Sequence, residues 1–324
     1  MFNEQHDARV ERYLGKKRFF WKFFKNRKIE NPTFEYPILY GVEMEYEVET
    51  PRKMTQEGTH REFRAKVANQ LEPSFQDFAF AKHDGSLDNG FEVVSVPMSL
   101  DAHAEQWKPF FDLAPANGLR VRVNCGMHVH VSRELLTTLQ IGKILAMIYS
   151  KNNLPFIKTM ANRTKLVWDG RNRVFTELEA KKLSDVKNHR NRYAALNIQG
   201  HETIEFRFFK STLNLDRMLT NLEFCKAMIE FTWPSGASVC EIEKNGVELF
   251  CKFVLAHRKE FPHLSEFLKE HKYITWEAKK CPARYIQKPV GKKKVETSKG
   301  IIKRAFPELL EPHNVWGFGW RGVE

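Results

Sequence analysis

Residues 38–49 read ILYGVEMEYEVE, and from Val42 onward apolar and acidic side chains alternate without a break. In an extended strand the apolar members share one face: Val42, Met44, Tyr46 and Val48. The acidic members share the other: Glu43, Glu45, Glu47 and Glu49. Glutamate is a poor strand residue, and like charges about 6–7 Å apart repel each other, so we expect cationic groups to face this row.

Three further segments have the same two-sided character. Strands are predicted at 76–82 (QDFAFAK) and 91–96 (FEVVSV), joined by the turn HDGSLDNG, which places Asp84 and Glu92 near one strand end. In 119–132 we expect two short strands or one bulged strand, with His128 and His130 on one face. In 191–209 we expect strand, turn and strand, with Glu205 and Arg207 opposite an apolar face.

Between these strands the pattern predicts helices rather than a regular strand–helix–strand rhythm, which favours an α+β fold with a largely antiparallel sheet. The expected helices are 60–72, 99–117 beginning near Ser99 or Asp101, 134–161 with an interruption at 152–155, 215–232, 243–260 and 263–271. If the four strands pair, helices cover the apolar side and the other side carries carboxylates, imidazoles and guanidinium groups. Carboxylates in that number suit hard cations such as Mg²⁺ or Mn²⁺.

Each motif also has an ordinary structural interpretation. An alternating Glu strand is typical of a solvated sheet face, two His at this spacing occur on surfaces, and a Glu-x-Arg pair commonly forms a cross-strand ion pair. The DGS sequence is a common turn. Four such coincidences in one chain are much less frequent than any one of them, so together they favour a site. Arg207 and Arg192 offer planar forks for phosphate, which points to phosphoryl chemistry.

Taken together, several motifs resemble the amidoligase branch of the glutamine synthetase/glutamate–cysteine ligase superfamily in their order and approximate spacing: GVEMEYE, HDGSLDNGFEVVSVPM, CGMHVHVS, RYAALN and ETIEFRFF. The resemblance spans residues 38–230. It implies a curved, mostly antiparallel sheet of the glutamine-synthetase catalytic type, with helices on the apolar face and with ATP and Mg²⁺ or Mn²⁺ on the other. The implied activity is an ATP-dependent ligase, in which a carboxylate forms an acyl phosphate and an amine then displaces phosphate.

The resemblance also implies residue roles. The metal ligands would be Glu43, Glu45, Glu92, His128, His130 and Glu205. Arg207 and Arg192 would contact the transferring phosphate, and with Glu205 they would form the ATP site. Asp84 would hold the amine and accept its proton. An acyl phosphate hydrolyses when wet, so a lid is expected, and residues 164–187 are the predicted one.

The net charge of +12 is concentrated near the two ends of the chain. Residues 9–28 and 279–304 are strongly basic, and they leave the remainder mildly acidic. We therefore predict a basic aromatic arm at 1–30, a catalytic domain at 31–278 and a basic segment at 279–324 that ends in a Trp/Gly-rich docking stretch. Nucleic acid, an anionic membrane or an acidic protein would suit the ends, or the ends are solvated surface. Non-catalytic binding on the same fold and ATP-independent metal hydrolysis are the alternative functions.

Five scattered cysteines without metal spacing favour a reducing compartment. We expect neither a signal peptide nor a transmembrane helix, because no apolar run has the required length. A cytoplasmic protein is the resulting expectation. The sequence identifies neither the amine nor the carboxylate substrate, and it does not determine the oligomeric state.

Overall fold

The computed structural model describes residues 38–49, 57–75, 78–133, 136–163, 194–200, 202–233 and 236–274. The predicted arm at 1–30, the predicted lid at 164–187, Arg192 and the predicted segment at 279–324 lie outside these ranges. Among the described helices, none is both long enough and apolar enough to cross a membrane.

The described part of the chain is an α+β structure built on one open antiparallel sheet. Its seven strands are β1 (Tyr40–Val48), β2 (Ala79–Lys82), β3 (Gly90–Ser95), β4 (Leu119–Arg120), β5 (Gly126–Ser132), β6 (Leu196–Asn197) and β7 (Thr203–Lys210). Their order is β2-β3-β1-β5-β7-β6, and β4 pairs with one end of β1. The four strands with the two-sided pattern, β3, β1, β5 and β7, therefore lie in one sheet, where they are consecutive neighbours.

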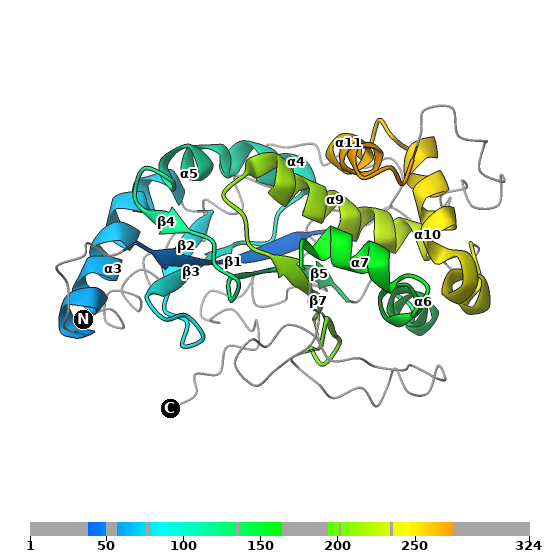
Figure 1. The fold of residues 1–324 in the computed structure, drawn as a ribbon, viewed down its shortest axis with the longest axis horizontal. Coiled ribbons are helices and arrows are strands. Elements are labelled where there is room, and N and C mark those ends of the chain that lie inside the picture. Colours follow the sequence, from blue (N-terminus) through cyan, green and yellow to red (C-terminus); the bar gives the residue numbers. More distant parts are fainter. Residues whose placement is uncertain are drawn as a thin grey trace, which may run out of the picture.

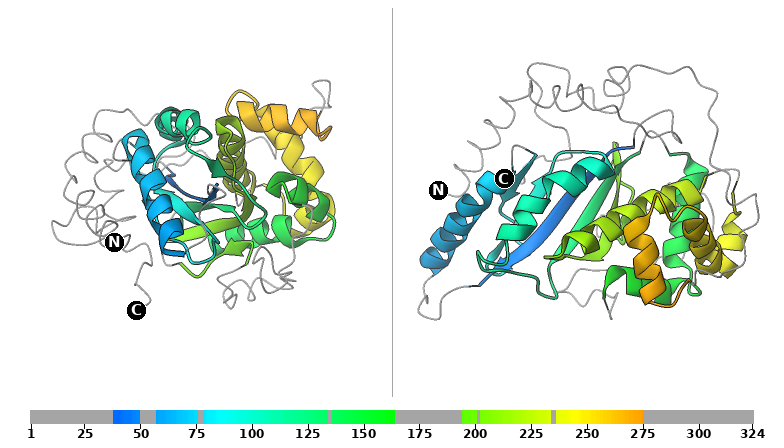
Figure 2. Two further views of the ribbon diagram at one scale, coloured as in Figure 1. Left: turned by 60° about the vertical axis from the view of Figure 1, so that its left-hand side comes forward. Right: turned by 90° about the horizontal axis from the view of Figure 1, so that it is seen from above.

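The helices are α3 (Glu57–Leu71), α4 (Leu100–Gln106), α5 (Lys108–Leu113), α6 (Thr138–Tyr149), α7 (Leu154–Ala161), α9 (Leu215–Phe231), α10 (Val239–Ala256) and α11 (Pro262–Glu270), with a 3₁₀ turn η1 (Glu72–Phe75). Helices α4, α5 and α9 lie along one side of the sheet (Figure 1). Figure 2 shows α10 and α11 together at one end of the molecule and α3 at the other.

The apolar face of the sheet meets these helices, as the alternation predicts. The Tyr46 ring lies 5.5 Å from the Phe110 ring of α5, and its hydroxyl donates a hydrogen bond of 2.8 Å to the Thr212 carbonyl. On α9, the Asn221 side-chain amide donates to Met127 Sδ at 3.3 Å. Val42, Met44 and Tyr46 are completely buried, which fixes the acidic members of β1 on the opposite face.

The predicted helix at 99–117 is instead two helices, α4 and α5, separated at Trp107. Pro109 follows directly in the first turn of α5, where its missing N–H costs nothing, so the sequence restarts a helix there rather than continuing one. Ser99 caps α4 as expected, since its hydroxyl accepts from the Ala102 N–H at 3.3 Å. The predicted interruption between α6 and α7 is confirmed, and 119–132 forms two strands. Helix α10 starts four residues earlier than predicted, because Ser238 and Glu241 form a capping box.

A bulge interrupts the pairing of β5 with β7. Met127 pairs with Phe209 and Val129 pairs with Phe206, so β7 carries one extra residue at this point. The shift lets both Phe208 and Phe209 reach the Phe224 ring, at 6.0 Å and 5.9 Å between ring centroids. Strand β7 can therefore bury consecutive aromatic side chains although its first half alternates.

Candidate metal centre

The sheet register brings together acidic and imidazole side chains that are far apart in the sequence. Glu43 of β1 lies opposite His128 of β5, and His130 of β5 lies opposite Glu205 of β7. On the other side of β1, Glu45 lies opposite Glu92 of β3. Because side chains on adjacent strands share a face when they are directly paired, these groups form one continuous polar face.

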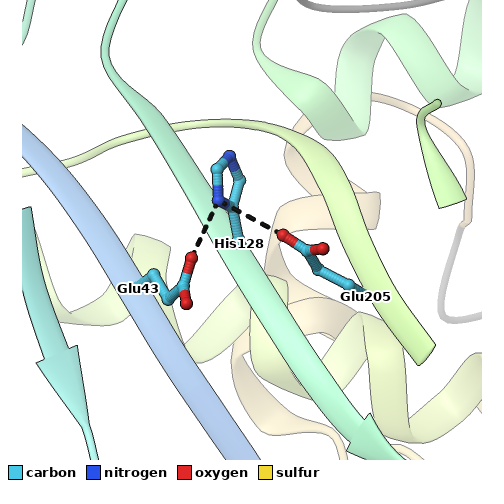
Figure 3. A group of neighbouring side chains, drawn as sticks. All are labelled: Glu43, His128 and Glu205. Carbon is cyan, nitrogen blue, oxygen red and sulfur yellow. Dashed lines mark hydrogen bonds and ion pairs between the residues drawn. The ribbon is translucent and has the colours of Figure 1, made fainter. Parts of the chain in front are cut away.

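Three of these side chains converge closely. His128 Nδ1 lies 3.2 Å from Glu43 Oε2 and 3.4 Å from Glu205 Oε1 (Figure 3). One ligand atom from each residue falls within 4.8 Å of the other two. All three residues are buried, each with less than a tenth of its surface exposed.

His130 brings a second imidazole to the same two carboxylates. Its Nε2 lies 3.2 Å from Glu43 Oε1 and 3.8 Å from Glu205 Oε1, and its Nδ1 is 3.3 Å from Thr203 Oγ1. The predicted HxH pair therefore faces Glu43 and Glu205 from a single strand.

The three convergent residues fit a divalent cation in both chemistry and spacing. Ligand atoms about 2.1 Å from one ion lie about 3–4 Å from each other, and the two His128–carboxylate distances fall in that range. Two carboxylates and one imidazole suit Mn²⁺ well, and Mg²⁺ accepts the carboxylates with further oxygen ligands. We call Glu43, His128 and Glu205 the donor triad.

The charges of the donor triad are set by its surroundings. Burial alone would raise the pKa of Glu43, but His130 and His128 outweigh it and hold that pKa well below its usual range. The pKa of Glu205 is likewise lowered, because His130, Arg207 and His128 outweigh burial. Burial opposes protonation of His130, yet the Glu43 and Glu205 carboxylates raise its pKa. The two triad carboxylates are therefore anionic and ready for a cation.

Arg207 and Asn197 fix the orientation of Glu205. The Arg207 guanidinium pairs with Glu205 Oε1, and the Asn197 amide donates to Oε2 at 2.9 Å. Burial disfavours the charged guanidinium, but the Glu205, Glu43 and Glu45 carboxylates raise the pKa of Arg207 above its ordinary value. Groups that hold a metal ligand in this way sharpen its geometry. Arg207 remains a quarter exposed and faces the polar side.

Glu45 and Glu92 occupy the neighbouring part of the polar face without belonging to the donor triad. Glu45 Oε2 accepts the Gly126 N–H at 2.6 Å, and burial with the nearby Asp84 charge raises the pKa of Glu45. Glu92 Oε2 lies 3.0 Å from Lys82 Nζ, and burial together with the Glu43 charge raises its pKa well above the usual range.

Gly126 makes room for this arrangement. A Cβ atom at this position would sit 3.0 Å from His128 Nε2 and 3.3 Å from Glu45 Oε2. The glycine before the HxH motif therefore permits the close approach of β5 to the Glu45 carboxylate.

Asp84 lies at the rim of the site, in the turn between β2 and β3. Its Oδ1 accepts the Ser86 N–H at 2.6 Å, which is the local bond expected of an Asp in a turn. The residue is half-buried, and its charge contributes to the raised pKa of both Glu45 and Glu92. The structure thus brings this predicted site residue to the polar face.

Glu47 has a role that the alternating pattern does not reveal. It is only 1% exposed, and its carboxylate accepts the backbone N–H groups of Asp88 and Asn89 at 2.9 Å and 2.7 Å. The Asn124 amide adds a third bond of 3.0 Å. Glu47 therefore ties two loops to β1, the one carrying Asp84 and the one leading into Gly126. The polar, turn-rich sequence HDGSLDNG is the signal that could have suggested such a partner.

Of the predicted site residues, eight lie on or beside one face: Glu43, Glu45, Asp84, Glu92, His128, His130, Glu205 and Arg207. Arg192 lies outside the described residues. Comparison with protein-family models and with curated proteins gives no match.

Proposed function

We propose that this protein is a divalent-metal-dependent enzyme of phosphoryl transfer, and specifically an ATP-dependent ligase that joins a carboxylate to an amine. The observation that carries the proposal is the convergence of the donor triad with Arg207 beside it on the same buried face. A hard-cation site next to a guanidinium suits phosphate oxygens, which bind to both. The sequence motifs resemble those of amidoligases in their order. On that basis we include the amide-forming step and a sheet of the glutamine-synthetase type in the proposal.

In this proposal Glu43, His128 and Glu205 hold Mg²⁺ or Mn²⁺, and Glu45, Glu92 and His130 complete the predicted ligand set. The ion would neutralise charge on the transferring phosphate and on the acyl phosphate of the substrate. Arg207 lies beside the triad, where its outer N–H groups can donate to the same phosphate. Arg192 is proposed as a second phosphate contact, and the segment 164–187 as the lid.

Asp84 is proposed to receive the amine. Its carboxylate lies at the rim of the face rather than within the donor triad, so it can bind an ammonium group entering from solvent. It would accept the proton that the amine loses when it attacks the acyl phosphate. Its hydrogen bond from the Ser86 N–H holds the carboxylate in place.

We also propose a cytoplasmic location and a polyanionic partner. The described cysteines are free thiols (Cys125, Cys225, Cys240 and Cys251), which supports a reducing, cytoplasmic location. The basic segments at 9–28 and 279–304 are proposed to bind a polyanionic partner or substrate, such as nucleic acid.

Calorimetric titration with ATP and Mg²⁺ tests this function. The unmodified protein should bind ATP only with the metal, and Glu45→Ala and Arg207→Ala should each weaken binding by at least ~10-fold. Glu62→Gln, an exposed change on α3, is the matched control and should bind like the unmodified protein.

The outcomes separate the competing functions. ATP binding that needs metal, followed by phosphate release only when a carboxylate and an amine are both added, supports the ligase. Metal binding without ATP binding favours a hydrolase. Salt-sensitive binding of nucleic acid that is indifferent to substitution of Glu43 or Glu45 favours a non-catalytic binding protein.

A further inference from the structure

Lys82 is a largely buried cation on the polar face to which no role has yet been given. It is the last residue of β2 and lies directly opposite Glu92 of β3. Its Nζ is 3.0 Å from Glu92 Oε2, and the two side chains are 12% and 3% exposed. Removing two charges from water is costly unless they are paired with each other. An incidental surface contact therefore does not account for this ion pair.

Glu92 stands between this ammonium and two more carboxylates. The register places Lys82 on one side of Glu92 and Glu45 on the other. The Glu43 carboxylate is also close enough to interact with Glu92. In a site of metal ligands, a divalent ion would be the usual means of holding three carboxylates together. Among the residues that the structure describes, the Lys82 ammonium is the positive charge that contacts Glu92.

The described polar face holds two permanent cations, and each contacts a different carboxylate. Four buried carboxylates lie on this face, namely Glu43, Glu45, Glu92 and Glu205. Glu47 is set apart, because both of its oxygens accept N–H groups from the adjoining loops. Lys82 and Arg207 supply two permanent positive charges. Lys82 pairs with Glu92 and Arg207 pairs with Glu205, whereas Glu43 contacts the imidazoles of His128 and His130, so the donor triad is where a divalent cation can bind.

We propose that Lys82 supplies a built-in cation at Glu92 in place of a second divalent ion, so that the polar face takes one Mg²⁺ or Mn²⁺, at the donor triad. A lysine ammonium is a compact point charge and can stand where a small cation would otherwise bind. This inference rests on the proposed metal site and narrows it, since it assigns Glu92 to Lys82 rather than to the ion.

The test counts Mn²⁺ ions bound to the full-length protein by equilibrium dialysis and atomic absorption. The unmodified protein should bind one ion per chain. Lys82→Met, which keeps the length of the side chain but removes its charge, should bind two. Lys82→Arg should still bind one, and the double variant Lys82→Met/Glu92→Gln should return to one, because the second site needs both the lost ammonium and the Glu92 carboxylate.

Two results would overturn the inference. One is an unchanged ion count in Lys82→Met when its circular dichroism spectrum matches that of the unmodified protein. The other is two ions in the unmodified protein, a result that does not depend on any variant folding. Glu205→Gln tests the donor triad separately: it should lose the original ion, whereas Lys82→Met/Glu205→Gln should keep the gained one. A failure of the triad is thereby distinguished from a failure of the role of Lys82.

Discussion

His128 faces Glu43 across the β1–β5 pair, and its Nδ1 lies 3.2 Å from Glu43 Oε2 while the same nitrogen is 3.4 Å from Glu205. One imidazole thus stands between carboxylates from two different strands. The candidate metal site is therefore a property of the sheet register.

Glu43→Gln should weaken Mn²⁺ binding by at least about 100-fold, because it removes an anionic ligand. Loss of a residue that only orients a metal ligand already lowers metal affinity by about 10–100-fold. Titration followed by the electron paramagnetic resonance signal of free Mn²⁺ measures the effect. Glu62→Gln makes the same chemical change at an exposed site and should not alter binding. Equal affinity in the two variants would remove Glu43 from the metal site.

Gly126→Ala should disturb the site while leaving the fold intact. The added Cβ would press on His128 Nε2 and Glu45 Oε2, and both side chains can move away at the cost of the triad geometry. We expect Mn²⁺ affinity to fall by about 10-fold. Gly41→Ala is the control on the neighbouring strand, since its Cβ would meet His130 Cβ at an ordinary 3.5 Å. The crowding argument is wrong if both alanine variants bind Mn²⁺ alike.

Glu47→Gln should destabilise the protein, because one carboxylate oxygen that accepts a backbone N–H becomes an amide donor. Hydrogen bonds to a buried charged group contribute about 1.5–3 kcal/mol, so we expect a loss of about 2 kcal/mol in urea unfolding. Ligase activity should fall as well, since the loop that carries Asp84, the proposed amine-binding residue, loosens.

Glu49→Gln provides the comparison for this change. Glu49 belongs to the same alternating series but is exposed, and it pairs with Arg120 at 2.6 Å on the surface. Exposed pairs contribute little, so its unfolding free energy should change by less than about 1 kcal/mol. Similar losses for Glu47→Gln and Glu49→Gln would contradict the role assigned to Glu47.

His103 should make stability depend on pH. Its Nε2–H donates to the Tyr40 carbonyl at 2.8 Å, and its Nδ1 accepts from Trp107 Nε1–H at 3.0 Å, so both nitrogens are engaged only in the neutral ring. Burial lowers its pKa from 6.5 to about 4.

Between those two values the unfolded chain binds the proton and the folded chain does not, so the stabilising contribution is complete above pH 6.5 and is lost as the pH falls toward 4. The loss is on the order of 3 kcal/mol for this group. His103→Gln should reduce the slope of unfolding free energy between pH 7 and pH 4.5, whereas the same change at exposed His271 should not. Parallel slopes in the two variants would rule out the buried imidazole as the cause.

The sequence by itself determined which side chains share a face. A strand has a period of two, so the alternation in β1 and the HxH spacing in β5 fix Glu43 and Glu45 on one side and His128 with His130 on one side, whatever strands lie beside them. The covering helices and most of their positions followed from apolar periodicity. Periodicity alone does not predict the break at Trp107, because the apolar pattern continues through it, although Pro109 marks a new helix start.

Only the tertiary structure decided which strands are neighbours and in what register. Antiparallel pairing of β1 with β5 rather than with another strand places His128 opposite Glu43, and a shift of one residue would turn every polar side chain of one strand toward the helices. The order of the strands in the sheet also places Lys82 beside Glu92 and lets Glu47 bind the loops. Local periodicity cannot encode these contacts, because they join residues that are far apart in the sequence and meet only when the core packs.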